Sequence, residues 1–574
     1  MRAVFVVQRT MFSQQLPSTS LSLYARLREA WATGLSCSSD VAFAFGVSFL
    51  WLLLYNAHFW RLTFDAMWQL NPRTLLFTVS LFVLGLSLQA LPLLVCPTRR
   101  LMRFLASVMF VVAALGGYFG EVYGAIMNQD MMRNVLQTDA TEALSLLNAD
   151  VAIHVILLGI LPAALVWRIR LPRIHWRKQL AQRGIAIIAC VTMAVIGMIA
   201  NSAQYATFLR EHKPVRYTLN PAAQIVSMAA LLAASDAAPN QPLIDAAGAI
   251  EHTSAVASKP LVLFLVIGET ARAANFQLGG YQRSTNPELA QIPSLVYFSN
   301  VSACATSTAL SVPCLFSHFG RSDFKVSEAK RYANLLDSLV KAGFEVQWRD
   351  NNSGCKGVCA RVATIDYTHT QASSLCSASN CYDEILLTDL PDTLRKIRHD
   401  TAIVFHQKGS HGPSYFERYP PSQERFLPAC RSNQLQHCSQ QEIANAYDNS
   451  IAYTDHVLAR QISLLQAADA HIDSLLLYVS DHGESLGENG LYLHGMPYPF
   501  APAVQKQVPM LLWASDGYLN RTRLRPECLR DAARQPVSHD FFYHTVLGAA
   551  EILNQVYDPK LDLITGCRQG SGSE

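Results

Sequence analysis

Several parts of the sequence combine carboxylate, imidazole and hydroxyl side chains, which are the groups that bind metal ions and phosphates. Asp481 and His482 are adjacent, and they can converge on one ion because Gly483 loosens the turn. Glu269 offers a third ligand from another part of the chain. Two carboxylates and one histidine leave one position of a tetrahedral zinc ion open, which is typical of a catalytic site rather than a structural one.

Four short apolar runs of β-forming character occur after Pro260. They alternate with helical segments, which favours an α/β domain around a mostly parallel sheet. Each run is followed by polar residues, and ligands bind at the carboxyl ends of strands in such sheets. This convergence favours a metal site over a loop charge or a helix cap as the role of Asp481 and His482. The runs, each with its polar segment, are Leu261–Ile267 with Gly268–Thr270, Phe344–Trp348 with Arg349–Asn352, Thr401–Phe405 with His406–His411, and Ser474–Val479 with Asp481–Gly483.

The sequence also offers a nucleophile. Segment Ser302–Ala309 is rich in hydroxyl groups among small residues, as at the start of a helix that faces a phosphate. A neutral threonine is a weak nucleophile, but zinc coordination lowers its pKa and generates an alkoxide. Lys356 could neutralise a phosphoryl oxygen. Spacing alone leaves open whether Lys356 does so or is a surface loop residue.

The composition divides the chain into two parts that need different solvents. Of 574 residues, 50% are hydrophobic and 16% are Asp, Glu, Lys or Arg, against about 25% in an ordinary soluble protein. Only eight of the 43 acidic residues precede Ser202, so the part after it has the composition of a globular domain. Disorder and a small disulfide scaffold are excluded. A net charge of +3, without basic runs interleaved with aromatics, gives no support to nucleic acid as a partner.

Five apolar windows approach or reach the length of about 20 residues that crosses a bilayer. Little charge lies inside any of them, which argues against a soluble helical bundle. We therefore predict five spans, of which the fourth is the shortest. The windows are Val41–Phe59, Thr74–Val95, Phe104–Tyr123, Val151–Trp167 and Gly184–Ala200.

The basic residues of the loops predict the orientation of these spans, because cytoplasmic loops are enriched in Lys and Arg. Alternate loops are basic, so the N-terminus is expected in the cytoplasm. An odd number of spans then places everything after Ser202 on the outer side, which is the periplasm in a bacterium. No cleaved signal peptide is expected. The basic residues are Arg2, Arg9, Arg26 and Arg28, then Arg99 and Arg100, then Arg168, Arg170, Arg173, Arg177, Lys178 and Arg183.

The loop between the third and fourth windows carries Asn134, Thr138 and Glu142 at i, i+4 and i+8. If Met131–Leu147 is helical, all three side chains project from one face. On residue types alone, a solvated polar face of an interfacial helix explains this spacing better than a binding site.

A connector follows the fifth window. Apolar Ile225–Ala234 predicts an amphipathic segment on the membrane surface, and proline-containing sequence after it predicts an extended linker. We therefore divide the chain into a transmembrane domain at residues 1–202, a connector and linker at 203–260, and a catalytic domain at 261–574.

Thirteen cysteines are present, and most of those in the second part are closely spaced in pairs. Such pairs suggest zinc in a cytosolic protein. In the oxidising compartment that the topology predicts, local disulfides are expected instead. Cys528 and Cys567 could form a further bridge, although nothing local pairs them. The close pairs are Cys304 with Cys314, Cys355 with Cys359, Cys376 with Cys381, and Cys430 with Cys438.

Five motifs in the second part of the chain resemble those of the lipid A phosphoethanolamine transferases, including the mobile colistin-resistance type, and the similarity spans both parts of the chain. The resemblance implies an alkaline phosphatase or sulfatase-like fold for the second part. One departure is Ala305, where a glycine is expected, and it affects loop packing rather than a ligand. The motifs are Gly268–Arg272 with Asn275 and Phe276, Cys304–Cys314, Arg349–Lys356, Gly409–Pro413 and Asp481–Gly490.

The resemblance also implies roles for individual residues. Glu269, Thr308, Asp481 and His482 match the ligands of one zinc ion, and Thr308 matches the nucleophile that receives phosphoethanolamine. His411 and His494 match residues that hold the donor phosphate or a second zinc ion. The positions implicated in recognising ethanolamine or phosphate are Asn134, Thr138, Glu142, Ser353 and Lys356.

The implied reaction has two steps and uses two lipids. Thr308 attacks the phosphorus of phosphatidylethanolamine and diacylglycerol leaves; a lipid A phosphate then accepts the phosphoethanolamine, which lowers affinity for polymyxins and other cationic peptides. We expect a monomer in the bacterial inner membrane. An arylsulfatase would need a Cys or Ser followed by x-Pro-x-Arg, which Cys314 lacks. A phosphoglycerol transferase is the nearest rival, and another periplasmic glycan is an alternative acceptor.

Overall fold

The computed structural model describes residues 36–66, 72–138, 143–144, 146–235, 242–253, 258–368, 370, 374–376 and 380–569. Arg2, Arg9, Arg26, Arg28 and Glu142, which the sequence singled out, lie outside these ranges. The described residues form two compact units. Unit 1 lies within Met1–Tyr55, Met67–Ala114 and Val155–Thr207, and unit 2 within Asn56–Ala66, Leu115–His154 and Phe208–Glu574. The predicted boundaries at residues 202 and 260 stay predictions.

Within the described ranges, four helices are long and apolar enough to cross a membrane, and they cover four of the five predicted windows. They are α4 (Pro72–Val95), α5 (Arg99–Tyr123), the helical stretch Ala149–Arg168 and α10 (Trp176–Ala200). The first window is divided between α2 (Asp40–Leu54) and α3 (Ala57–Ala66), which meet at a 62° bend. The first window makes a fifth span if α2 and α3 together cross the membrane once.

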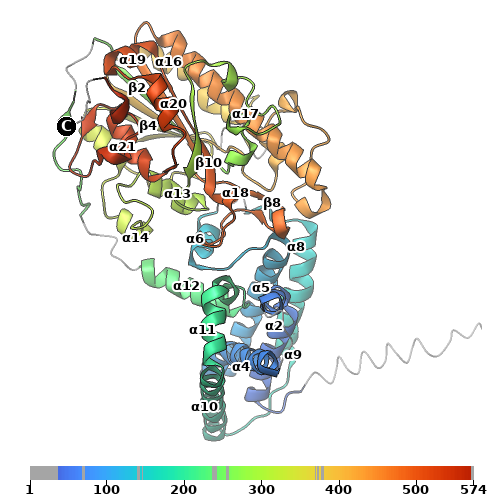
Figure 1. Ribbon diagram of the computed structural model, residues 1–574. Coiled ribbons are helices and arrows are strands. Elements are labelled where there is room, and N and C mark those ends of the chain that lie inside the picture. The colour runs from blue at the N-terminus through green and yellow to red at the C-terminus, as the bar shows by residue number, and fades with distance from the viewer. Residues whose placement is uncertain are drawn as a thin grey trace, which may run out of the picture. The chain divides into compact units, whose positions relative to one another are not determined.

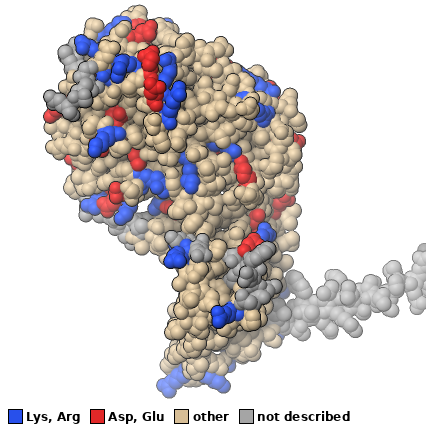
Figure 2. Space-filling view, viewed as in Figure 1, with Lys and Arg blue, Asp and Glu red and all other residues tan. Residues whose placement is uncertain are grey.

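The surface of unit 1 is apolar, as expected for helices that face lipid. Only 17% of the apolar window of α10 is buried within the protein. Lys and Arg side chains gather where α10 begins, and acidic side chains are scarce there (Figure 2). This end carries the exposed Arg173, Arg177 and Lys178, so the structure agrees with the basic loop that the sequence placed in the cytoplasm.

A buried carboxylate joins three helices of unit 1. Asp40, at the start of α2, is 2% exposed. Its oxygens lie 2.9 Å from Arg99 Nε of α5 and 2.8 Å from Arg183 Nη2 of α10. A buried charge is stable only when it is paired and hydrogen-bonded, so these contacts fix the three helices against one another.

The core of unit 2 is an eight-stranded sheet in the order β11-β3-β10-β7-β2-β6-β4-β5. The four predicted strands are adjacent and parallel in it, which confirms them. They are β7 (Asp473–Ser480), β2 (Leu261–Gly268), β6 (Thr401–His406) and β4 (Glu345–Asp350). The sequence missed the flanking strands β3 (Val296–Ser302), β10 (Gln507–Ala514), β11 (Val537–Ser538) and β5 (Ala363–Asp366).

Helices cover both faces of this sheet (Figure 1). Leu263 and Leu265 of β2 pack with α13 (Thr308–Leu315), α15 (Leu335–Lys341) and α21 (Asp540–Ala549). Phe264 and Val266 pack on the opposite face with α16 (Leu390–Lys396) and α17 (Gln440–Ala468). A strand buried on both faces is continuously apolar, which is why β2 could be recognised in the sequence.

The segment before the catalytic fold is helical where the sequence predicted a connector. It contains α11 (Ser202–Glu211), a 3-10 helix η2 (Lys213–Tyr217) and α12 (Ala222–Ser235). The buried side chains of α12 pack against α6 (Gln129–Gln137).

The structure differs from the sequence interpretation at the helix considered for Met131–Leu147. Helix α6 ends at Gln137, and Thr138 has an extended backbone conformation with ψ 130°. The Thr138 hydroxyl donates to Asn134 O at 2.8 Å, and such local side-chain bonds compete with helix continuation. Asn134 and Thr138 therefore do not belong to one continuous helix through residue 147.

Five disulfides brace unit 2. The four pairs predicted from spacing are all present. Cys528 and Cys567, whose pairing the sequence left open, form the fifth bridge. Cys37, Cys96 and Cys190 are free.

Candidate active site

Three potential metal ligands meet at the carboxyl end of the sheet. Glu269 follows β2, and Asp481 and His482 follow β7, the adjacent strand. One ligand atom of each lies within 4.8 Å of the others, and all three residues are buried. His482 Nε2 is 3.4 Å from Glu269 Oε1 and 3.3 Å from Asp481 Oδ2. The parallel register brings together residues that are more than 200 positions apart.

Thr308 completes this group. It is the first residue of α13, and its Oγ1 lies 3.1 Å from Glu269 Oε2 and 3.3 Å from His482 Nε2. The first backbone N–H groups of the helix favour an anion near this point. All four residues that the resemblance matched to zinc ligands are therefore in one cluster.

The hydrogen bonds around the cluster leave ligand atoms available. Asp481 Oδ1 accepts the backbone N–H groups of Thr270 and His482, whereas Oδ2 is buried and has no hydrogen-bond partner in the described part of the chain. His482 Nδ1 lies 2.9 Å from Gly483 O. With the proton on Nδ1, Nε2 is free to act as a ligand. An orphaned buried carboxylate oxygen beside an imidazole nitrogen and a second carboxylate fits a divalent cation.

Burial disfavours the charged forms of all three ligands. Burial, and then the Asp481 charge, raise the pKa of Glu269 to about 7. Burial likewise raises the pKa of Asp481 to about 7, and it lowers the pKa of His482 well below its usual value. Each pKa shift arises because a medium of low polarity disfavours the charged form of the group. A bound cation would favour the forms that act as ligands, namely ionised carboxylates and a neutral imidazole.

Backbone geometry holds Glu269 in place. Thr270 has φ 51°, an unusual value for a β-branched residue, and such strain clusters at functional sites. Its carbonyl accepts the hydroxyl of Tyr447 at 2.7 Å. Gly409 also has positive φ, and a Cβ there would lie 2.6 Å from Glu269 O. Glycine at 409 is therefore required for the close approach of two loops.

His411 and His494 lie beside the cluster. The ring centroid of His494 is 4.4 Å from that of His482 and 5.4 Å from that of His411. Its Nδ1 is 2.9 Å from Glu484 Oε2, and Glu484 Oε1 accepts the Tyr415 hydroxyl at 2.7 Å. The sequence analysis missed Glu484, although its position two residues after His482 in a polar loop was a signal.

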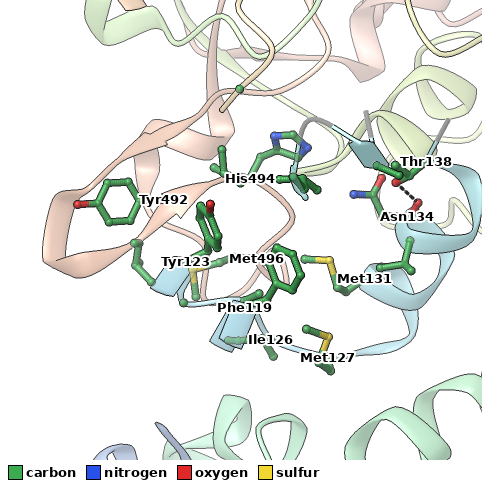
Figure 3. Close-up of a pocket in the computed structure, with 18 of the residues that line it drawn as sticks. Phe119, Tyr123, Ile126, Met127, Met131, Asn134, Thr138, Tyr492, His494 and Met496 are labelled. Carbon is green, nitrogen blue, oxygen red and sulfur yellow. Dashed lines mark hydrogen bonds between the residues drawn. The ribbon is translucent and has the colours of Figure 1, made fainter. Parts of the chain in front are cut away.

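A pocket of about 300 Å³ in unit 2 opens beside these histidines. It is lined by the end of α5, by α6 and by the segment with β9 (Tyr492–Leu493) that leads to His494 (Figure 3). Four predicted substrate residues line it, namely Asn134, Thr138, His411 and His494. The other walls are mainly apolar, and they include Phe119, Tyr123, Ile126, Met127, Met131 and Met496.

Ser353 and Lys356 lie elsewhere in unit 2. Lys356 Nζ donates to Ser353 O at 2.9 Å and to Ser353 Oγ at 2.7 Å. Neither residue is among the described residues that line the large pocket. Their loop approaches the cluster through Asn352, whose Nδ2 donates to Glu269 Oε2 at 2.6 Å. Asn352 is the second residue for which the sequence analysis proposed no role.

Buried polar groups support this loop and its neighbour. His406 Nδ1 is 3.0 Å from Asp350 Oδ2. Burial alone would raise the pKa of Asp350, but His406 and nearby hydrogen bonds lower it to about 2. Asp383 accepts the backbone N–H groups of Lys408 and Gly409 at 2.7 and 2.8 Å. These interactions fix the loops that carry Asn352 and His411.

The chain was compared with known proteins. Residues 262–552 match the sulfatase family model, and residues 75–235 match the model of phosphoethanolamine transferase EptA/EptB. Phosphoethanolamine transferase EptA of Escherichia coli K12 is 34% identical over 91% of this chain and 97% of its own. Phosphatidylethanolamine transferase Mcr-1 of Escherichia coli is 38% identical over 75% of this chain and 84% of its own.

A solved structure is similar over both parts. It is the integral membrane protein lipooligosaccharide phosphoethanolamine transferase A of Neisseria meningitidis, which is 33% identical, with a TM-score of 0.88 and coverage of 93% of this chain and 99% of that chain.

The fold and the buried cluster define a membrane-anchored enzyme of the alkaline phosphatase and sulfatase type. The chain belongs to the phosphoethanolamine transferase family. It is an integral membrane protein with a periplasmic catalytic domain, which confirms the predicted family, fold class and location.

Proposed function

We propose that the enzyme transfers phosphoethanolamine from phosphatidylethanolamine to a phosphate of lipid A through a covalent intermediate on Thr308. The observation that carries this proposal is the position of the Thr308 hydroxyl, 3.1 Å from Glu269 and 3.3 Å from His482 Nε2. The names of the relatives support it, because they include phosphatidylethanolamine transferase and lipooligosaccharide phosphoethanolamine transferase.

The cluster would hold one zinc ion through Glu269, Thr308, Asp481 and His482. When bound, zinc lowers the pKa of a coordinated hydroxyl and neutralises charge on phosphoryl oxygens. His411 and His494 are available either for the donor phosphate or for a second zinc ion.

The residues of the chain would perform the first half-reaction as follows. The Thr308 hydroxyl passes its proton toward Glu269 as its oxygen forms a bond to phosphorus. The bond from phosphorus to the glycerol oxygen breaks, and that oxygen takes up the proton from Glu269 as diacylglycerol leaves. We assign His494, which Glu484 orients, to holding the donor phosphate.

The second half-reaction reverses these roles. An oxygen of the acceptor phosphate attacks the phosphorus on Thr308, the bond from phosphorus to the Thr308 oxygen breaks, and that oxygen takes up the proton that the acceptor phosphate gives up, with Glu269 as the relay. Displacement at phosphorus needs mainly positioning and charge neutralisation. A pair of histidines and a buried cation site suit that task.

The large pocket suits a lipid donor. Asn134, Thr138 and the two histidines give it polar groups, whereas three methionines and three aromatic rings give it apolar walls. Pockets of this kind bury an apolar ligand and orient it by a few polar contacts. We assign the ethanolamine phosphate to the polar groups and the glycerol with the adjoining acyl carbons to the apolar walls.

The nearest rival functions differ in donor or acceptor. A phosphoglycerol transferase would take phosphatidylglycerol as its donor, and a relative of different specificity would modify another periplasmic glycan.

The decisive experiment is mass spectrometry of lipid A from cells with and without the protein. A phosphoethanolamine increment that depends on the protein, together with lower polymyxin susceptibility, is expected. Unmodified lipid A would contradict the acceptor assignment.

The expected product explains the predicted resistance. An added amine masks the negative charge of a lipid A phosphate, so cationic peptides bind the product less well. Both substrates are lipids, so the bilayer is a partner of the enzyme, and we propose that it works as a monomer.

A further inference from the structure

A second pocket of about 80 Å³ lies beside α13 in unit 2. It is lined by residues of α13, by residues in and after α14 (Val326–Ala329), and by the loop that follows β4. Apart from Lys356, the function proposed above gives its residues no role. The polar groups of its lining include Ser317, Lys330, Tyr332, Lys356 and Arg361.

The described lining of this pocket is cationic. It contains two lysines and one arginine, and no carboxylate. Arg361 is neutralised by Asp337, which its Nε and Nη2 contact at 2.5 Å. The partners of Lys356 Nζ are neutral oxygens of Ser353. Lys330 and Lys356 therefore leave two positive charges that no carboxylate of the described residues pairs.

A phosphate monoester matches this pocket in charge and in hydrogen bonding. Such a group carries about −1.5 to −2 charges at pH 7 and offers three acceptor oxygens. Ser317 Oγ already accepts the Phe319 N–H at 3.1 Å, so its own proton is available to a ligand. The Arg361 bonds to Asp337 use Nε and Nη2, so Nη1 remains available.

The walls of the pocket are held in place. Asn334 accepts backbone N–H groups at the start of α15, and its Nδ2 donates to Val358 O at 2.8 Å. The Cys355–Cys359 disulfide closes the loop that carries Lys356. A site whose charges are fixed before binding loses less entropy when a ligand enters.

The pocket adjoins the proposed catalytic centre. Pro313, which lines it, follows Thr308 by five residues on α13, or roughly 8 Å along the helix. The Lys356 loop begins at Asn352, which bonds Glu269. A ligand in the pocket is thus near, but not at, the reacting hydroxyl.

We propose that this pocket binds a second phosphate of the acceptor, namely the one that is not being modified. Lipid A carries phosphates at its 1 and 4′ positions, so an acceptor held by one of them presents the other to Thr308. The inference rests on the proposed function, and it assigns the acceptor class as a glycolipid with two phosphates. Free inorganic phosphate has the same chemistry and is distinguished by the experiment.

The experiment measures acceptor kinetics with the full-length enzyme in detergent. Lys330 is exposed and lies at the end of α14, so Lys330→Glu and Lys330→Gln can be made without disturbing the core. Lys325, an exposed lysine at the other end of this helix, does not line the pocket, and Lys325→Glu is the matched control. The acceptors are lipid A with two phosphates and lipid A with one.

With the bisphosphorylated acceptor, KM should rise about tenfold in Lys330→Glu and less in Lys330→Gln, as for loss of a charge-assisted contact. The value of kcat and the yield of the Thr308 adduct without acceptor should not change. In the wild type, KM for the monophosphorylated acceptor should be higher than KM for the bisphosphorylated one. It should be unchanged in Lys330→Glu and Lys330→Gln. Inorganic phosphate should compete with the bisphosphorylated acceptor in the wild type and less in Lys330→Glu.

Three outcomes would overturn the inference. The first is an unchanged KM in Lys330→Glu, or a rise matched by Lys325→Glu. The second is an equal rise for both acceptors, which would indicate a general charge effect. The third is that Lys330→Glu weakens inhibition by inorganic phosphate but leaves KM for the acceptor unchanged, which would indicate a site for free phosphate only. Absence of any Thr308 adduct in the wild type would instead refute the proposed function.

Discussion

Asn352 donates a hydrogen bond of 2.6 Å to Glu269 Oε2 in the buried cluster. This bond leaves Glu269 Oε1, which lies 3.4 Å from His482 Nε2, as the oxygen best placed for a cation. Asn352 also donates to Gln407 O at 2.9 Å, so one amide ties the loops after β4 and β6 to the ligand that follows β2. Outer groups that orient a metal ligand commonly affect affinity by about 10- to 100-fold.

Asn352→Leu is therefore expected to lower zinc affinity by at least about tenfold. The variant removes the donor and leaves Glu269 Oε2 buried without its partner. Metal content after dialysis against graded chelator would measure the loss. Asn520→Leu, an exposed position on α19 (Asp516–Thr522), is the control and should retain zinc. Wild-type metal content in Asn352→Leu would show that the bond does not orient a ligand.

Thr308→Ala should abolish both the covalent adduct and diacylglycerol release, because among the described residues no other hydroxyl contacts both Glu269 and His482. A loss of at least about a thousandfold is expected for removal of a nucleophile. The neighbouring Thr306 hydroxyl donates to Met496 O at 2.5 Å, so Thr306→Ala should still form the adduct. Incubation with phosphatidylethanolamine and no acceptor, followed by peptide mass spectrometry, measures this. Continued diacylglycerol release by Thr308→Ala would exclude the two-step mechanism.

Zinc removal should make stability depend on pH. Glu269 and Asp481 have folded-state pKa values of about 7, above those of the unfolded chain. Their neutral forms stabilise the metal-free protein at low pH, and this stability is lost as pH rises from about 4 through 7. The change is roughly 4 kcal/mol per carboxyl at most. Thermal unfolding of the chelated full-length protein should show Tm falling from pH 5 to pH 8.

Saturating zinc should reverse this trend, because metal binding competes with protons for the same ligand atoms. The zinc-loaded protein should therefore gain Tm relative to the chelated protein, and the gain should be larger at pH 8 than at pH 5. An equal effect of zinc at both values would contradict a site built from these carboxyls.

Glu484→Gln should lower kcat by about tenfold or more while the protein stays folded. Glu484 bonds His494 Nδ1 and the Tyr415 hydroxyl, so the amide keeps the shape but loses the charge that orients the imidazole. Tyr415→Phe removes only the outer bond and should have a smaller effect. Initial rates of adduct formation would measure both, and equal rates in all three proteins would remove Glu484 from the mechanism.

Reporter fusions test the topology. A fusion after Ser202 should report the periplasm and one after Arg177 the cytoplasm, because α10 separates these positions. Cytoplasmic reporting from both would contradict the orientation and, with it, the oxidising environment that the five disulfides require.

The sequence by itself determined the features that are local. Apolar windows and continuous apolar strands can be found in the sequence, because a segment that faces lipid or lies in a core is apolar whichever distant segments pack against it. For this reason β2, β4, β6 and β7 could be predicted, and so could the four close cysteine pairs. The polar residues after each strand could also be found, and the family resemblance supplied roles for Thr308 and the ligands.

Only the tertiary structure decided what depends on contacts between distant segments. Asn352 contacts Glu269, which lies in another loop, and Glu484 contacts the ring of His494. The residue types alone do not predict either contact. The separation of Lys356 from the His494 pocket follows from strand order, because β4 and β7 are not neighbours in the sheet. Sheet order is set by the packing of the whole core, which no single segment specifies.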